Sequence, residues 1–386
     1  MAPNRSFDAV IIGSGSVGTP AALFLAEAGV RTLVIDQYPS AGQGSNKRAI
    51  GGLRATHSDP AKIRLCLRSL EIISTWEERY GDDLGWHKGG YCYVVYRPED
   101  EKTLKDLLVI QHTFGLNIRW LDKEGILEAV PGINPIGLIG GTLSPDNGHA
   151  SPLLVVEAFH RHAKRAGAEF HFGEKATGLV IEGGRVRGVR TDKGEYGAEV
   201  VINAAGPWAA EVGKFAGVDL AVTPDQHEGA VTEPVSRFLE PLVVDMRPAK
   251  GSANYYFYQH ATGQVVFCIT PSPSLWGYDV RETSEFLPMV SRRMVDLLPR
   301  LKNLRVRRTW RGLYPMTPDG FPIIGWTKEV EGYLLAVGMC GQGFMLGPGV
   351  GELLVRMILK TQTARDDEVL SYVSPYREFK GLEKLQ

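Results

Sequence analysis

Three glycines near the start of the chain have the spacing of a phosphate-binding loop. Gly13, Gly15 and Gly18 form GxGxxG, and Asp36 ends the next apolar run. The first glycine permits a tight turn, the second lets backbone approach a pyrophosphate, and the third lets a helix pack closely on a strand. Asp36 can accept hydrogen bonds from ribose hydroxyls, so the pattern predicts a dinucleotide site. The neighbours that we expect at this site are Ser16, Val17 and Gln37.

A second glycine-rich turn, GMCGQGF (338–344), lies far downstream between an apolar run and a helical pattern. Two helix N-termini aimed at one site suit a flavin, because the second can face the N1–C2=O edge that gains negative charge on reduction. An ordinary tight turn would give the same pattern, and the residues alone leave both interpretations open. The cofactor contacts expected from this turn are Gly338, Gly341, Gln342, Gly343, Phe344 and Met345.

Composition excludes several classes of protein. The 386 residues hold 43 Lys plus Arg and 44 Asp plus Glu, for a net charge of −1, which argues against nucleic-acid binding. The four cysteines are far apart, which indicates neither a disulfide framework nor a zinc site. We predict no metal site, and we expect His160 and His162 at the surface. Because no apolar run is long enough to span a membrane, we expect a soluble cytoplasmic protein without direct membrane insertion.

Several segments resemble the D-amino-acid oxidase/glycine oxidase superfamily of flavoenzymes, over nearly the whole chain. They are the N-terminal glycine motif, VVINAAGPWA (200–209), TPDGFPIIG (317–325) and GQGFMLGPGVGE (341–352). Within the superfamily, GGLRATHSD (51–59) and HEGAVTEP (227–234) most resemble the sarcosine oxidase β subunit and the β subunit of heteromeric proline dehydrogenase.

The pattern of elements and this resemblance predict an α/β fold. Residues 7–36 read as strand, turn, helix and strand, which is a βαβ unit with parallel strands. Helices are expected at 61–80 and 152–166. We predict a Rossmann-like FAD-binding domain interleaved with an antiparallel-sheet substrate domain. The FAD-binding domain takes 1–87, 150–221 and 316–386, and the substrate domain takes 88–149 and 222–315.

The resemblance implies a non-covalent FAD. Some relatives link the flavin to a cysteine at the position of Gly312, and neither Cys268 nor Cys340 matches it. Certain β subunits tether a second flavin, FMN, through a histidine where this chain has Ser151, with His149 two residues away. Only a non-covalent FMN at a subunit interface therefore stays open. Further FAD contacts that the resemblance implies are Ser45, Arg48, Gly51, Gly52, Leu53, Val180, Ala205, Gly206, Trp208 and Gly312.

Three residues are candidates for the substrate pocket. The resemblance places Arg54 beside the flavin or the substrate carboxylate, which a guanidinium can grip bidentately. His227 could take the proton of a substrate ammonium, and a hydrogen-bonded structural histidine is an equal alternative. Tyr256 lies in an alternating strand in which Tyr258 shares its face. His260 is a weaker candidate.

The function implied is oxidation of a small secondary amine or amino acid, of the sarcosine, proline, hydroxyproline or dimethylglycine type, to an imine by hydride transfer to flavin N5. The chain would act as the β subunit of a hetero-oligomer, with an α subunit and small electron-carrier subunits. Met345 stands where several oxidases have a lysine, which favours a dehydrogenase. The alternatives are a stand-alone glycine or D-amino-acid oxidase producing hydrogen peroxide, a non-catalytic FAD-binding subunit, and a nicotinamide dehydrogenase, which the second glycine turn disfavours.

Overall fold

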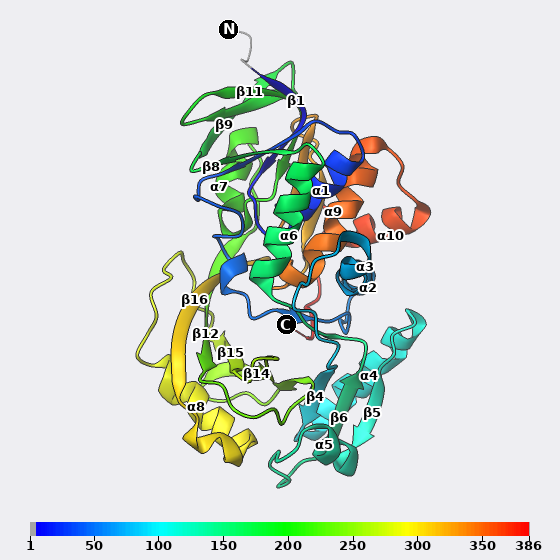
Figure 1. Cartoon of the computed structure of the whole chain (residues 1–386). Coiled ribbons are helices and arrows are strands. Elements are labelled where there is room, and N and C mark those ends of the chain that lie inside the picture. The colour runs from blue at the N-terminus through cyan, green and yellow to red at the C-terminus, as the bar shows by residue number, and fades with distance from the viewer. Residues whose placement is uncertain (1–4, 386) are drawn as a thin grey trace.

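Two eight-stranded sheets form the upper and lower halves of this computed structural model, which describes residues 5–385 (Figure 1). In the upper sheet the strand order is β17-β18-β11-β1-β2-β8, and β10 and β9 extend from β11 as antiparallel neighbours. Its strands are β1 (Ser6–Ile12), β2 (Thr32–Asp36), β8 (Glu169–Phe172), β9 (Ala176–Glu182), β10 (Arg185–Thr191), β11 (Glu195–Asn203), β17 (Ile323–Trp326) and β18 (Tyr333–Val337).

The lower sheet is mostly antiparallel, in the order β16-β12-β15-β14-β13-β4-β6-β5. A separate two-stranded sheet pairs β3 (Gly52–Leu53) with β7 (Gly148–His149). The lower strands are β4 (Tyr91–Val95), β5 (Arg119–Asp122), β6 (Gly140–Ser144), β12 (Thr223–Thr232), β13 (Leu242–Asp245), β14 (Gly251–Gln259), β15 (Val265–Ser272) and β16 (Val306–Met316).

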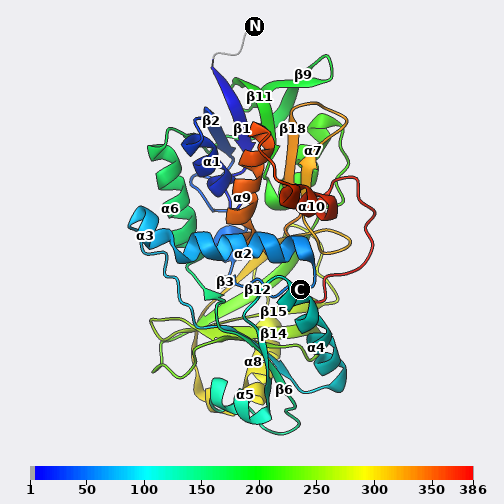
Figure 2. The same ribbon diagram turned by 90° about the vertical axis from the view of Figure 1, so that its right-hand side faces the viewer.

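Helices cover the upper sheet and join the halves. The helices are α1 (Gly18–Glu27), α2 (Pro60–Ser74), α3 (Trp76–Tyr80), α4 (Pro98–Thr113), α5 (Lys123–Ala129), α6 (Pro152–Arg165), α7 (Ala209–Gly213), α8 (Phe286–Leu297), α9 (Gly343–Leu359) and α10 (Ala364–Val373). Figure 2 shows α2 lying across the middle of the molecule, between α1 and α9 above and the lower sheet below. Among residues 5–385, no helix is both long and apolar enough to cross a membrane.

The mixed α/β class predicted from the sequence is confirmed. β1 pairs in parallel with β2 and β11, and α1 connects β1 to β2 as a βαβ unit. The upper strands come from 6–36, 169–203 and 323–337, and the lower ones from 91–144 and 223–316. The chain thus crosses between the halves several times. The two-domain division stays a proposal, and its residues 1–4 and 386 lie outside the described residues.

Two local expectations were wrong. The helix expected at 61–80 is two helices, because the chain breaks at Thr75, where φ is −102° and ψ is 6°. His160 and His162 are not surface residues, since their side chains are only 16% and 11% exposed. The His162 ring packs against Trp76 and Tyr80, and its Nε2 lies 2.6 Å from the Asp82 carboxylate.

Small residues let α9 lie directly on the glycine loop and α1. A Cβ built on Gly347 would stand 1.9 Å from the Ser16 carbonyl oxygen, and one on Gly351 would stand 2.9 Å from the Ala21 nitrogen. Any side chain at these two positions would push the helices apart. The glycines of this segment therefore fix the second glycine turn, which opens α9, against the first.

Candidate functional site

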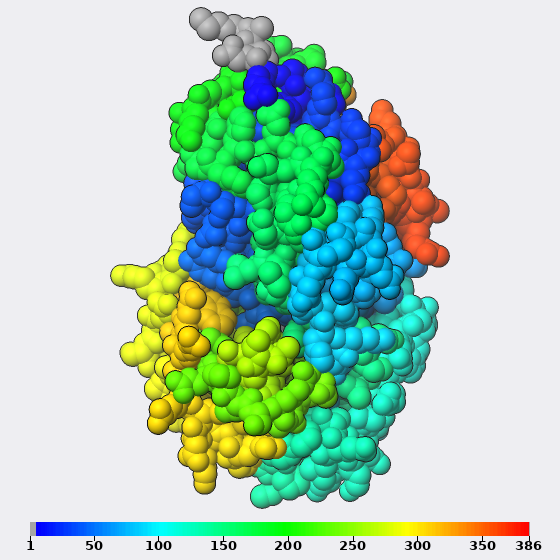
Figure 3. All heavy atoms as spheres, in the orientation of Figure 1, coloured from blue at the N-terminus to red at the C-terminus, as the bar shows by residue number. Residues whose placement is uncertain are grey.

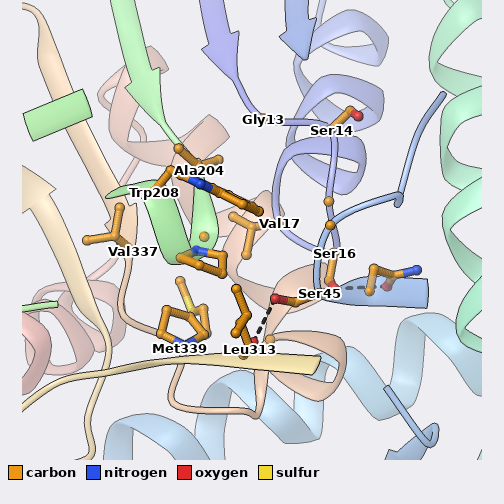
Figure 4. Close-up of a pocket in the computed structure, with 18 of the residues that line it drawn as sticks. Gly13, Ser14, Ser16, Val17, Ser45, Ala204, Trp208, Leu313, Val337 and Met339 are labelled. Atoms are coloured by element: carbon orange, nitrogen blue, oxygen red, sulfur yellow. Dashed lines mark hydrogen bonds between the residues drawn. The ribbon is translucent and has the colours of Figure 1, made fainter. Parts of the chain in front are cut away.

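One large cavity lies where the two glycine turns meet the end of β16 (Figure 4). It encloses about 1450 Å³ of space free of protein atoms, including its open mouth. The segment after β2 forms part of its lining, and Figure 3 shows that segment in blue between the green upper part and the yellow lower part. The predicted site residues that line it are Gly13, Gly15, Ser16, Val17, Asp36, Gln37, Ser45, Arg48, Ala205, Gly206, Trp208, His227, Gly312, Gly338, Gly341, Gly343 and Phe344.

The first glycine turn fits a phosphate group. Gly13 has φ of 109°, and a Cβ there would stand 2.4 Å from the Ala204 carbonyl oxygen. A Cβ on Gly18 would stand 1.8 Å from the Gly13 carbonyl oxygen, so both positions exclude a side chain for packing reasons. At Gly15 a Cβ would meet no atom within 4 Å. The free space at Gly15, which lines the cavity, lets a bound phosphate approach the backbone.

Asp36 has a structural task in addition to the predicted one. Its carboxylate accepts hydrogen bonds from the Ser14 amide at 2.7 Å, the Ser14 hydroxyl at 2.6 Å and the Tyr38 amide at 2.9 Å. A carboxylate has about four acceptor positions, so capacity remains for a ribose hydroxyl. Asp36 therefore holds the loop in shape, and its contact with a ribose stays a prediction.

The adenosine end of the cavity differs in detail from expectation. Ala205, Gly206 and Trp208 line it, as does Ala176 at the start of β9. Val180, four residues further along β9, does not line it. The residue of this strand that lines the cavity is thus its first, next to Lys175.

The second glycine turn lies against β16. Gly341 has φ of 76°, and a Cβ there would stand 2.1 Å from the Tyr314 ring. Cys340 is also left-handed, with φ of 49°, although it carries a side chain. The ring of Tyr314 lines the cavity, so the turn presents its backbone to the space beside this phenol.

A histidine and two tyrosines form a connected group at this end. The rings of His227 and Tyr314 are stacked, with centroids 3.7 Å apart and an interplanar angle of 15°. The Tyr314 and Tyr256 hydroxyls lie 2.9 Å apart and share a hydrogen bond. Burial raises the pKa of both phenols, which keeps them protonated. Tyr256 thus reaches the cavity through Tyr314, without lining it.

Asp225 sets the tautomer of His227. Burial works to raise the pKa of the Asp225 carboxyl, but the hydrogen bond and charge of His227, together with hydrogen bonds from Leu275 and Ser274, outweigh it, and the pKa lies below its usual value. His227 Nε2, which lies 3.2 Å from the Asp225 carboxylate, therefore carries a proton. His227 Nδ1 has no hydrogen-bond partner among residues 5–385. In a neutral ring this nitrogen is a buried, unpartnered acceptor of a residue that lines the cavity.

Cys268 lines the cavity, but its thiol is expected to be unreactive at neutral pH. Its thiol donates to the Glu228 carbonyl oxygen at 3.1 Å, and burial raises its pKa to about 12. A thiol with this pKa is almost wholly protonated at neutral pH and is a poor nucleophile.

Arg54 lies outside the cavity lining. It is 3% exposed and donates to the carbonyl oxygens of Thr56 and Leu385. Its guanidinium carbon lies 5.7 Å from the centroid of the Tyr91 ring and 5.8 Å from that of Tyr93. Other predicted contacts that do not line the cavity are Gly18, Gly51, Gly52, Leu53, Gln342 and Met345.

Tyr314 was not among the residues predicted at the site, although the sequence carries a signal for it. Gly312 was expected at the flavin, and residues two apart on a strand point the same way, so Tyr314 follows from Gly312 by alternation. His227 of β12 pairs with Gly312 of β16, which brings its ring next to that of Tyr314, two residues further along β16. Further lining residues that the sequence analysis missed are Ser14, Asn46, Cys268, Trp310 and Met339.

Comparison with known proteins identifies the family. A family model described as FAD dependent oxidoreductase (DAO) matches residues 8–357. The chain belongs to this family. FAD is thus its cofactor, in agreement with the free space at Gly15 and with the turn at Gly341. Among residues 5–385, no cluster of three His, Cys, Asp or Glu could hold a metal ion.

Three relatives illustrate the range of this oxidoreductase family. The structure of L-proline dehydrogenase from P. horikoshii is 33% identical, with a TM-score of 0.89 over 97% of this chain and 98% of that one. Hydrogen cyanide synthase subunit HcnC of Pseudomonas aeruginosa is 29% identical, covering 92% of this chain and 93% of the relative. Glycine oxidase of Bacillus subtilis is 26% identical, covering 94% and 95%.

Proposed function

We propose that this FAD-dependent oxidoreductase oxidises a small secondary amine or amino acid to an imine. The observation that carries the proposal is the group formed by His227, Tyr314 and Tyr256 at one end of the FAD cavity. Bound FAD supplies the acceptor for the hydride that leaves the carbon next to nitrogen. Similarity to L-proline dehydrogenase and glycine oxidase supports an amino-acid substrate.

The chain's own residues would bind the substrate and manage its proton. An amine must be neutral to lose hydride, and we propose that His227, whose Nδ1 has no hydrogen-bond partner in the described chain, accepts the ammonium proton. Tyr314, which lines the cavity, would contact the substrate, and Tyr256 would position it through the hydrogen bond between the two hydroxyls. We assign the substrate carboxylate to Arg54, the cation expected there from the sequence.

FAD would be held by the two glycine turns and by Arg48. No covalent link is proposed, because the thiol in the cavity, Cys268, is protonated at neutral pH. Gly312 occupies the position at which some relatives carry a linking cysteine, and a Cβ there would stand 2.9 Å from the Arg48 Cβ. An FMN at a subunit interface stays a prediction.

The proposed assembly is a hetero-oligomeric dehydrogenase in the cytoplasm. One relative is named as a subunit of a synthase, which supports an assembly with partner chains. The four cysteines are free and buried, which suits a reducing compartment. Lys175 lines the cavity and follows Glu174, whose amide donates to the Asp36 carbonyl oxygen. Among the described residues that line the cavity, Lys175 is the only lysine, and we propose transfer of electrons to a partner.

A stand-alone glycine oxidase that releases hydrogen peroxide is the second candidate. Glycine oxidase of Bacillus subtilis matches this chain over nearly the full length of both. A non-catalytic FAD-binding subunit is the third alternative. The group of His227, Tyr314 and Tyr256 disfavours it, because a subunit that only binds FAD needs no titratable residue at the cavity.

An anaerobic titration separates these functions. The FAD-loaded chain is mixed in turn with sarcosine, L-proline, D-proline, dimethylglycine and glycine, and flavin absorbance is followed. Bleaching by a secondary amine, followed by slow reoxidation in air and fast reoxidation by an artificial dye, is the expected result. Bleaching by glycine with rapid peroxide release would favour the oxidase. A flavin that none of these compounds reduces would contradict the proposal.

A further inference from the structure

A segment of the lower half reaches across to the upper half beside the FAD cavity. Residues 273–285 connect β15 to α8, and in Figure 1 this yellow segment rises along β16 toward the upper half. Its residue Tyr278 contacts Pro207 and Trp208, which belong to the turn that follows β11. Both of these residues line the cavity. A side chain carried by the lower half thus touches a wall of the cofactor site that the upper half provides.

The first part of the segment is fixed on β12. The Asp225 carboxylate accepts from the Leu275 amide at 2.6 Å, and the Gln226 amide donates to the Leu275 carbonyl oxygen at 2.9 Å. The Gly277 amide donates to the Pro224 carbonyl oxygen at 2.9 Å. These bonds hold the backbone as far as the residue directly before the tyrosine.

The second part returns to the same strand. The Glu228 carboxylate, which is buried, accepts from the Thr283 amide at 2.6 Å and from the Thr283 hydroxyl at 2.7 Å. Tyr278 therefore stands in a short span whose two ends are bound to β12. Because the ends are already ordered, little further conformational entropy is lost when the tyrosine contacts the upper half.

The indole of Trp208 lies in contact with two tyrosine rings. The Tyr278 ring stacks on it with centroids 6.1 Å apart and an interplanar angle of 29°, and the Tyr38 ring meets it edge-on at 5.8 Å. The Tyr278 hydroxyl donates to the Pro207 carbonyl oxygen at 3.4 Å. Burial and the charge of Glu211 raise the pKa of this phenol, so it stays protonated and can donate.

The contacts of the indole decide where it can stand. Trp208 is only partly buried, so neighbouring rings and not a surrounding core limit its rotation. Tyr38 comes from the segment after β2, in the upper half, and Tyr278 comes from the lower half. Loss of Tyr278 would therefore leave the indole with one of its two ring contacts and would free it to turn away from the cavity.

We propose that Tyr278 is a positioning residue for FAD, and that residues 273–285 form a clasp between the two halves. Tyr278 holds the Trp208 indole against the bound cofactor, and this contact slows the release of FAD. The inference concerns the cofactor and holds whichever amine is oxidised.

Release of FAD from the holoenzyme tests the clasp. Each holoenzyme is diluted into FAD-free buffer, and the rise in the fluorescence of free FAD gives the release rate. Tyr278→Ala should release FAD about fivefold faster, the size expected for the loss of one aromatic pair. Tyr278→Phe keeps the ring and should stay within about twofold of the native rate. Trp276→Ala is the matched control, because it removes an exposed ring from the same segment, and it should leave the rate unchanged.

A variant of the indole shows whether Tyr278 acts through it. Adding Tyr278→Ala to Trp208→Ala should change the release rate little, because the contact is already lost, whereas independent effects would multiply. A multiplied effect overturns the clasp.

A milder variant covers the case in which Tyr278→Ala does not yield a holoenzyme. Tyr278→Leu keeps an apolar side chain without a ring, and it should also release FAD faster than the native chain. A role of Tyr278 in folding alone would lower the yield of holoenzyme and leave its release rate native, which overturns the clasp. The outcome is separate from that of the amine titration, since FAD release is measured without substrate.

Discussion

At the scale of single residues, the unpartnered nitrogen of His227 is the feature with the clearest chemical consequence. Replacing it in His227→Asn removes the proton acceptor while a polar group remains for Asp225. We expect the rate of flavin reduction by the amine to fall about 100-fold, a typical contribution of one acid–base group. Rapid mixing under anaerobic conditions measures this rate. His260→Asn is the matched control, because His260 lies outside the cavity lining; an equal loss in both variants would contradict the role.

Cys268 provides a second prediction at this scale. With a pKa raised to about 12, its thiol should resist alkylation at neutral pH and should form no flavin bond. Acid precipitation of the holoenzyme should leave all FAD in the supernatant, for both the native chain and Cys268→Ser. A yellow pellet that turns white only in the variant would show a covalent link through this residue.

The sequence predicts well those site residues that act through their backbone conformation. It predicts poorly those whose role depends on contacts with distant parts of the chain. Gly13 and Gly341 were identifiable because left-handed turns before helices require glycine. Arg54 was expected at the flavin from resemblance, but the structure buries it beneath residues more than 300 positions away, at Leu385. No local pattern encodes that contact, and the same holds for the stacking of His227 on Tyr314.

At the scale of elements, the packing of α9 on the glycine loop separates two kinds of glycine. Gly347→Ala should lower stability by about 1–3 kcal/mol, because its Cβ would press on the Ser16 carbonyl. Gly15→Ala should leave the apoprotein stable, because a Cβ there meets nothing, but should weaken FAD binding about tenfold or more. Thermal unfolding of the apoproteins and FAD titration measure both effects.

Gly194→Ala serves as the control for this pair, since Gly194 has no neighbour within 4 Å of a built Cβ and lies away from the cavity. It should change neither stability nor FAD affinity. If Gly15→Ala destabilised the apoprotein as much as Gly347→Ala, the cavity at Gly15 would be a packing feature and not a phosphate approach.

Helices and strands with a strong periodic pattern of apolar residues could be predicted from the sequence. The residues at which they begin, end or break could not. The βαβ unit and the three strands of β9 to β11 follow from apolar runs between glycine turns. The break at Thr75 could not be predicted, because helix propensity continues through 61–80. Trp76, the first residue of α3, packs against Phe159 with ring centroids 4.5 Å apart. This tertiary contact orients α3 away from the direction of α2.

At the scale of the whole molecule, buried neutral histidines should make stability depend on pH. Burial, followed by the neighbouring His87 and His260, lowers the pKa of His149 to about 3. Burial and the charges of Arg54 and Lys62 also lower the pKa of His57 well below its usual value. Both rings must gain protons when the chain unfolds in mild acid.

The sign of the effect follows from proton counting. Below the unfolded pKa of about 6.5 the unfolded chain binds more protons than the folded one, so stability falls as the pH falls toward 3. From about pH 7 to about pH 5, His149 alone should account for about 2 kcal/mol of lost stability. His149→Gln replaces the ring with a neutral side chain of similar length. It removes no hydrogen bond, because neither ring nitrogen has a hydrogen-bond partner in the described chain. Urea unfolding at saturating FAD, at both pH values, should therefore show a smaller loss in the variant than in the native chain, and parallel losses would mean that His149 is already protonated when folded.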